Sequence, residues 1–112
     1  MSFTYTTTLM LGIRTTYKEL SIDSIYDDQW LPYVEGHEGT DIRMLRSEGS
    51  DYIYIGKVLA SWNKYEDSNI HKEFEAWDFD MRKDIAHISN FIKKEFNFYC
   101  NMPKLMFFVK VS

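Results

Sequence analysis

The sequence predicts an α+β fold, an antiparallel or mixed sheet of about four strands with one long amphipathic helix packed on one face. Several segments alternate apolar and polar residues with the period of two that is typical of β-strands. A stretch between two of them repeats its apolar residues every three or four positions, as a helix facing a core does. No repeat, linker or low-complexity tract divides the 112 residues, so we expect a single domain over 1–112.

Four segments are predicted to be strands. Residues 3–13 alternate most regularly, with threonines along their second face. Residues 41–47 and 51–60 are predicted to form a hairpin through a glycine-containing turn. Both faces of the 51–60 segment are apolar or aromatic, which indicates a central strand covered on each side. Residues 104–111 alternate again and are expected to complete the sheet.

The long helix is predicted over 68–96. Its apolar residues share one face and are Ile70, Phe74, Trp77, Met81, Ile85, Ile88 and Ile92. Phe79 projects from the opposite face. It marks either a bend or a loop folded over the helix, or else an exposed aromatic side chain that contacts a partner. Lys93 and Lys94 occupy the last turn, where the helix dipole favours cations.

The segment 17–39 has the least regular pattern in the chain. A short helix is expected near 20–31, ending before Pro32, because the residue before a proline avoids the helical conformation. The glycine-containing acidic run 35–39 predicts a turn or loop. An irregular segment of this length in a small domain is often functional.

Charge and cysteine content narrow the class of protein. The net charge of −4 makes nucleic acid an unfavoured partner, because nucleic-acid-binding domains usually carry a basic face. The single cysteine, Cys100, excludes an intramolecular disulfide and fits a reducing compartment. The apolar runs are too short to span a bilayer. The sequence therefore predicts a cytoplasmic protein that does not act in a membrane.

No catalytic motif is recognisable. Phosphate-binding glycine loops and a nucleophile elbow are absent from the sequence, so an enzyme would need a site assembled only in three dimensions. Four potential metal ligands cluster in the loop, namely Glu35, His37, Glu38 and Asp41. Only one of them is a histidine and glycines loosen the loop, so a solvated acidic loop is favoured over a metal site. We predict no catalytic residue, no metal site and no cofactor, and we interpret Cys100 as a packed thiol.

Aromatic residues make up 17% of the chain, more than a small core needs. The predicted binding residues combine aromatic rings with forked or ionisable donors and are Trp30, Tyr33, His37, Arg43, Arg46, Trp62, Tyr65 and Phe79. The alternative for the tryptophans and most tyrosines is that they fill the core beneath the loop.

These observations favour a small non-enzymatic protein-binding module, an inhibitor or regulator of a host or defence protein. In general character the chain is similar to the small accessory proteins that phages and mobile elements encode. Self-association is also expected, because Met10, Tyr52, Tyr54 and Phe108 would leave a second apolar sheet face to be covered. The alternative function is binding or sequestering a small anionic ligand such as a nucleotide, with Arg43 or Arg46 on a phosphate.

Overall fold

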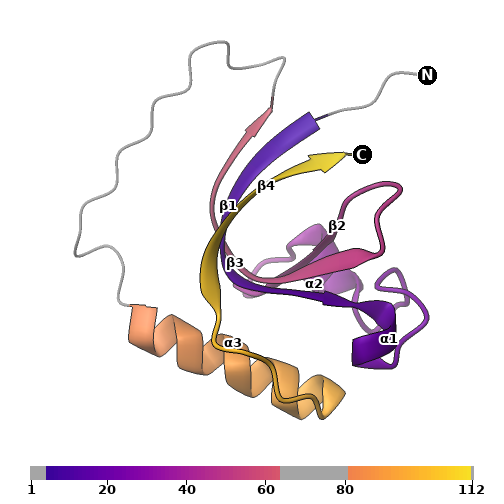
Figure 1. The fold of residues 1–112 in the computed structure, drawn as a ribbon, viewed down its shortest axis with the longest axis vertical. Coiled ribbons are helices and arrows are strands. Elements are labelled where there is room, and N and C mark those ends of the chain that lie inside the picture. Colours follow the sequence, from indigo (N-terminus) through magenta and orange to yellow (C-terminus); the bar gives the residue numbers. More distant parts are fainter. Residues whose placement is uncertain (1–4, 64–80, 112) are drawn as a thin grey trace.

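A computed structural model describes residues 5–63 and 81–111 (Figure 1). Its elements are β1 (Tyr5–Thr16), α1 (Tyr17–Leu20), α2 (Leu31–Glu35), β2 (Arg43–Arg46), β3 (Tyr52–Asn63), α3 (Met81–Phe96) and β4 (Lys104–Val111). The four strands form one antiparallel sheet in the order β2-β3-β1-β4. The predicted α+β class and four-stranded sheet are confirmed.

Strand β1 is paired on both sides and makes the most extensive pairings in the sheet. It pairs with β3 from Thr6 to Thr16, but with β4 only from Tyr5 to Gly12. The register with β3 shifts between Leu9 and Met10, as at a β-bulge. Strand β3 lies between β2 and β1, so the prediction of a central strand is confirmed. Strands β2 and β4 are the two edges.

The prediction of a short helix near 20–31 is wrong. Two shorter helices lie on either side of that segment instead (Figure 1). Thr16 caps α1 by accepting a hydrogen bond from the Glu19 N–H at 3.2 Å. Pro32 lies in the first turn of α2, where its missing N–H leaves no helical bond unmade. Pro32 therefore begins a helix, whereas the sequence pattern was interpreted as ending one there.

Helix α3 is the part of the predicted long helix that lies within the described residues. Ile88 and Ile92 are buried on its inner face, and the helix packs against β1 and β3. The predicted apolar face is thus buried at Ile88 and Ile92 and half-buried at Ile85, whereas Met81 at the start of α3 is exposed. The remainder of the predicted helix, including Phe79, lies outside the described residues.

The main core lies between the helices and one face of the sheet. It consists of Leu11, Ile13, Leu20, Ile25, Trp30, Ile42, Met44, Ile53, Ile55, Ile88 and Ile92. In β1 and β3 these are alternate residues, as a sheet with one helix-covered face requires. Fully burying each of these large side chains contributes about 1.5–3 kcal/mol to stability.

The second sheet face is partly covered by the sheet itself. Met10 and Leu45 are buried outside the main core, and the rings of Tyr54 and Phe108 stack with centroids 3.8 Å apart. These two rings come from strands on opposite sides of β1, so the sheet is strongly curled. The burial of Met10 therefore does not require a second copy.

The end of β4 reaches the turn between β2 and β3. The Val111 N–H donates to Ser47 Oγ at 3.0 Å, and the Glu48 N–H donates to the Val111 carbonyl at 2.7 Å. These bonds join the two edges of the sheet at one corner. They leave the remainder of β4 as an edge strand.

Gly12 and Gly56 face each other where the curl is tight. A Cβ atom on Gly12 would lie 2.1 Å from the Ile55 carbonyl oxygen, and one on Gly56 would lie 2.1 Å from that of Leu11. No side chain fits at that distance. Only glycine allows the two backbones to approach this closely.

Candidate interaction edge at strand β4

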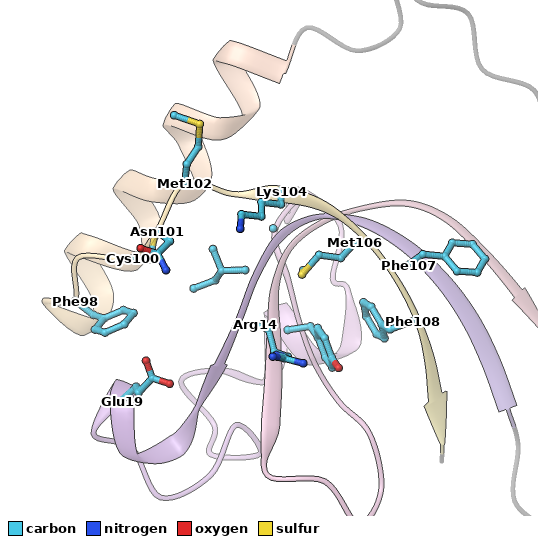
Figure 2. A pocket seen from close by; sticks show the side chains of 13 residues that line it. Arg14, Glu19, Phe98, Cys100, Asn101, Met102, Lys104, Met106, Phe107 and Phe108 are labelled. Carbon is cyan, nitrogen blue, oxygen red and sulfur yellow. The ribbon is translucent and has the colours of Figure 1, made fainter.

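Three successive apolar side chains on one face of β4 are exposed. Leu105 is 50% exposed, Phe107 67% and Val109 51%. We call these three residues the β4 patch. Figure 2 shows Phe107 pointing away from Met106 and Phe108, as alternation along a strand requires. Large apolar side chains clustered at this exposure are characteristic of interaction surfaces.

The backbone of the β4 patch points away from β1. In an antiparallel ladder the N–H and C=O of one residue point to the same side, and the side alternates along the strand. Val111 directs both of its groups to Ser47 and Glu48, on the side away from β1. Leu105, Phe107 and Val109 therefore direct theirs to the same outer side. Among the described residues, no hydrogen bond from another segment reaches these three positions.

The β4 patch continues the helix-covered face of the sheet. Leu105 and Phe107 pair with Leu11 and Leu9 of β1, and Leu11 belongs to the main core. Trp62 of β3 approaches Phe107 with ring centroids 6.2 Å apart. All three helices lie toward the lower part of Figure 1, whereas the ends of β1, β3 and β4 extend away from them. The apolar face thus runs on past the helices.

A groove of about 520 Å³ lies beside β4, and Lys104 and Phe107 are among the residues that line it (Figure 2). Its charged and amide groups come from Arg14, Glu19, Asn101 and Lys104, and its apolar wall includes Phe98, Cys100, Met102, Met106 and Phe108. Strand β1 continues to Thr16 after its pairing with β4 ends at Gly12, which opens this space. The Arg14 guanidinium lies 4.3 Å from the centre of the Tyr52 ring.

Two predicted binding residues belong to the core region. Trp30 is buried and stacks on Phe96 with centroids 4.7 Å apart. Tyr33 is half-buried and meets Phe91 edge-on at 4.8 Å. For these two rings the structure supports the alternative that they fill the core beneath the loop.

The predicted arginines are engaged with the protein backbone. Arg43 donates from Nε to the Tyr33 carbonyl at 3.1 Å and from Nη2 to the Val34 carbonyl at 2.9 Å. Arg46 donates from Nε to the Ser50 carbonyl at 3.0 Å. Arg43 therefore holds the end of α2 onto β2, and Arg46 holds the hairpin turn.

The other predicted binding residues do not gather around these arginines. His37 is exposed and pairs with Glu35 at 2.7 Å. Trp62 is half-buried and lies beside the β4 patch. Tyr65 and Phe79 lie outside the described residues. Among the predicted binding residues that the structure describes, Trp62 alone lies next to the exposed apolar surface.

The remaining chemical groups offer no assembled centre in the described part of the chain. No group of three or more histidine, cysteine or acidic side chains there is placed to hold a metal ion. Burial raises the pKa of the Cys100 thiol from its ordinary value, which favours the unreactive protonated form. No helix among these residues is long and apolar enough to cross a membrane.

The sequence interpretation missed the β4 patch. Leu105, Phe107 and Val109 were read as ordinary sheet residues because alternation does not show whether a face is covered. A usable signal lay in Lys104 and Lys110, since lysines near the ends of an apolar strand are typical of sheet edges. Comparison of the chain with known proteins finds no matching family model, no matching curated protein and no matching solved structure.

Proposed function

We propose that this chain is a small non-enzymatic protein-binding module whose partner adds an extended segment to the outer edge of β4. One observation carries the proposal. The three residues of the β4 patch expose their apolar side chains and also direct their backbone donors and acceptors outward. Strand addition uses both features together, because backbone bonds supply affinity and alternate side chains supply specificity.

A module of this kind acts by occupying a surface of its partner. We therefore propose that it inhibits or regulates that partner, a host or defence protein in the cytoplasm. The arrangement supports recognition of a protein surface because Arg43 and Arg46 of β2, the predicted cationic ligand groups, are used to hold the fold. The exposed apolar surface at β4 remains as the means of recognition.

The test compares variants in binding a partner captured from cells of the source. Phe107→Lys should abolish capture, because it places a charge in the centre of the β4 patch. Tyr99→Lys is the matched control, since Tyr99 is 78% exposed but lies outside the strand. Both variants should keep the wild-type melting temperature. Equal capture by both variants would exclude the β4 edge as the binding surface.

The groove beside Lys104 supports a second candidate function, binding of a small anionic ligand. Arg14 and Lys104 supply two cations next to an apolar wall, although Glu19 contributes an opposing charge. This site would replace Arg43 and Arg46 in the ligand-binding hypothesis. A thermal-shift panel of nucleotides and aromatic carboxylates tests it: a stabilisation that Arg14→Gln removes would support it, and no shift across the panel would contradict it.

A further inference from the structure

We propose that the partner segment is an extended peptide with apolar residues at alternate positions and an acidic residue near each end. This inference rests on the proposed binding of a strand to β4 and specifies its chemistry. Lys104 and Lys110 lie six residues apart in β4, on the opposite face from the β4 patch. They bracket the three outward-facing residues. In the described part of the chain, neither lysine belongs to an ion pair.

The open stretch of the β4 edge has defined limits. At one end, Ser47 and Glu48 already occupy the position beside Val111. At the other end, Pro103 precedes the strand and has no N–H to donate. An added strand therefore lies opposite 104–110, and its terminal residues come opposite the two lysines.

A second copy fits this stretch poorly. In a symmetric antiparallel pairing of two β4 strands, opposite residues must lie on the same face of the sheet. The pairing that uses all three outward residues places Phe107 opposite Phe107 and Leu105 opposite Val109. It also places Lys104 opposite Lys110 at both ends. Like charges directly opposite each other disfavour pairing.

Registers shifted along the strand separate the two lysines but lose backbone hydrogen bonds. Moving the centre to Phe108 requires the backbone of Val111, which is already hydrogen-bonded to Ser47 and Glu48. Moving the centre to Met106 requires Pro103 opposite Val109, where no N–H is available. Each shifted register thus loses backbone bonds at both ends. A foreign strand with acidic ends keeps every outward residue paired and places carboxylates opposite both lysines.

The two lysines also give the β4 edge a charge opposite to that of the whole protein. The protein carries a net charge of −4, whereas the charged residues of β4 are both lysines. An acidic segment is therefore attracted to the ends of β4. Because exposed charges are screened by ions, this preference should weaken with added salt.

The experiment uses two capped seven-residue peptides, Glu-Val-Thr-Val-Thr-Val-Glu and its counterpart with lysine at both ends. Each sequence is the same in both directions, so each can bind in either strand orientation. By fluorescence anisotropy at low salt, the wild-type protein should bind the acidic peptide at least tenfold more tightly than the basic one. The double variant Lys104→Glu/Lys110→Glu should reverse that order.

Two controls separate the possible failures. Phe107→Pro removes one outward N–H without touching the ladder to β1, so it should weaken both peptides and preserve the fold, as checked by circular dichroism. Equal binding of both peptides by the wild type would overturn the charge inference and leave the β4 edge as the binding site. Failure of both peptides to bind would contradict strand addition itself. A wild-type dimer in sedimentation that Phe107→Pro dissociates would show that the occupant is a second copy.

Discussion

The two halves of the curled sheet carry the same alternating pattern, but one half is buried and the other is exposed. In one half, Ile13 and Ile55 face the helices and are buried. In the other half, the same sheet face continues to Phe107 and Val109, which remain exposed. The pattern of a strand thus defines which residues share a face, whereas coverage depends on where the helices lie. The uncovered half is where we propose that a partner adds a strand.

The sharpest contrast compares a helix side chain that packs on the covered half of the sheet with a strand side chain on the uncovered half. Ile88→Ala should lower the free energy of unfolding by about 2–5 kcal/mol, because it leaves a cavity in the main core. Phe107→Ala removes a larger side chain but should cost less than about 1 kcal/mol, because the ring is already mostly exposed. Urea denaturation measures both. Similar losses would show that the β4 patch is packed and would remove the basis for the contrast.

The junction of the two halves depends on the glycine pair. Gly12→Ala should destabilise the protein by about 3 kcal/mol or more, above the usual range for overpacking, because its Cβ would meet the Ile55 backbone rather than a side chain that can move. Ser61→Ala, at an exposed position of β3, is the control. Thermal unfolding followed by circular dichroism distinguishes them. A Gly12→Ala protein as stable as the control would mean that the strands are less tightly curled there.

Arg43 and Arg46 test whether the polar groups of β2 stabilise the fold or belong to a binding site. Arg43→Ala should cost about 1.5–3 kcal/mol because it leaves two backbone carbonyls without their charged donor. Arg46→Ala breaks one such bond and should cost less. Chemical denaturation of the two variants provides the comparison. Unchanged stability for Arg43→Ala would return this residue to the list of binding candidates.

The smallest expected effect concerns Cys100. Burial raises the pKa of its thiol, so the folded protein holds the proton more tightly than the unfolded chain. The resulting stabilisation is fully present below the ordinary value of 9.0 and is lost as the pH rises through the folded-state pKa. The difference in unfolding free energy between wild type and Cys100→Ala should therefore shrink above pH 9. A constant difference up to pH 11 would contradict the raised pKa.

Much of this fold could be predicted because periodicity shows which residues share one face of a helix or strand. The spacing of Ile88 and Ile92 matches the inner face of α3, alternation predicts β1, β3 and β4, and the hairpin pattern predicts β2. The prediction of one short helix near 20–31 is wrong because the local pattern of Leu20, Ile25 and Trp30 resembles a helix face. In the structure these side chains reach the core from separate turns and helix ends.

The candidate site was harder to predict, because it depends on β4 having no neighbouring strand on its outer side. Arg43 and Arg46 are predicted to bind a ligand because of their residue type. In the structure they donate to backbone carbonyls instead, and the sequence does not reveal these partners. The exposure of Phe107 depends on β4 being an edge, which is a property of strand order. Strand order follows from long-range pairing and cannot be deduced from one segment.

Amide hydrogen exchange along β4, measured by NMR, tests the central claim most directly. The amides of Met106, Phe108 and Lys110 point into the ladder with β1 and should exchange slowly. Those of Leu105, Phe107 and Val109 point outward and should exchange rapidly until the acidic peptide is added. Alternating protection of this kind is the predicted result. Uniformly slow exchange along the strand in the free protein would show that the edge is already covered and would contradict the account.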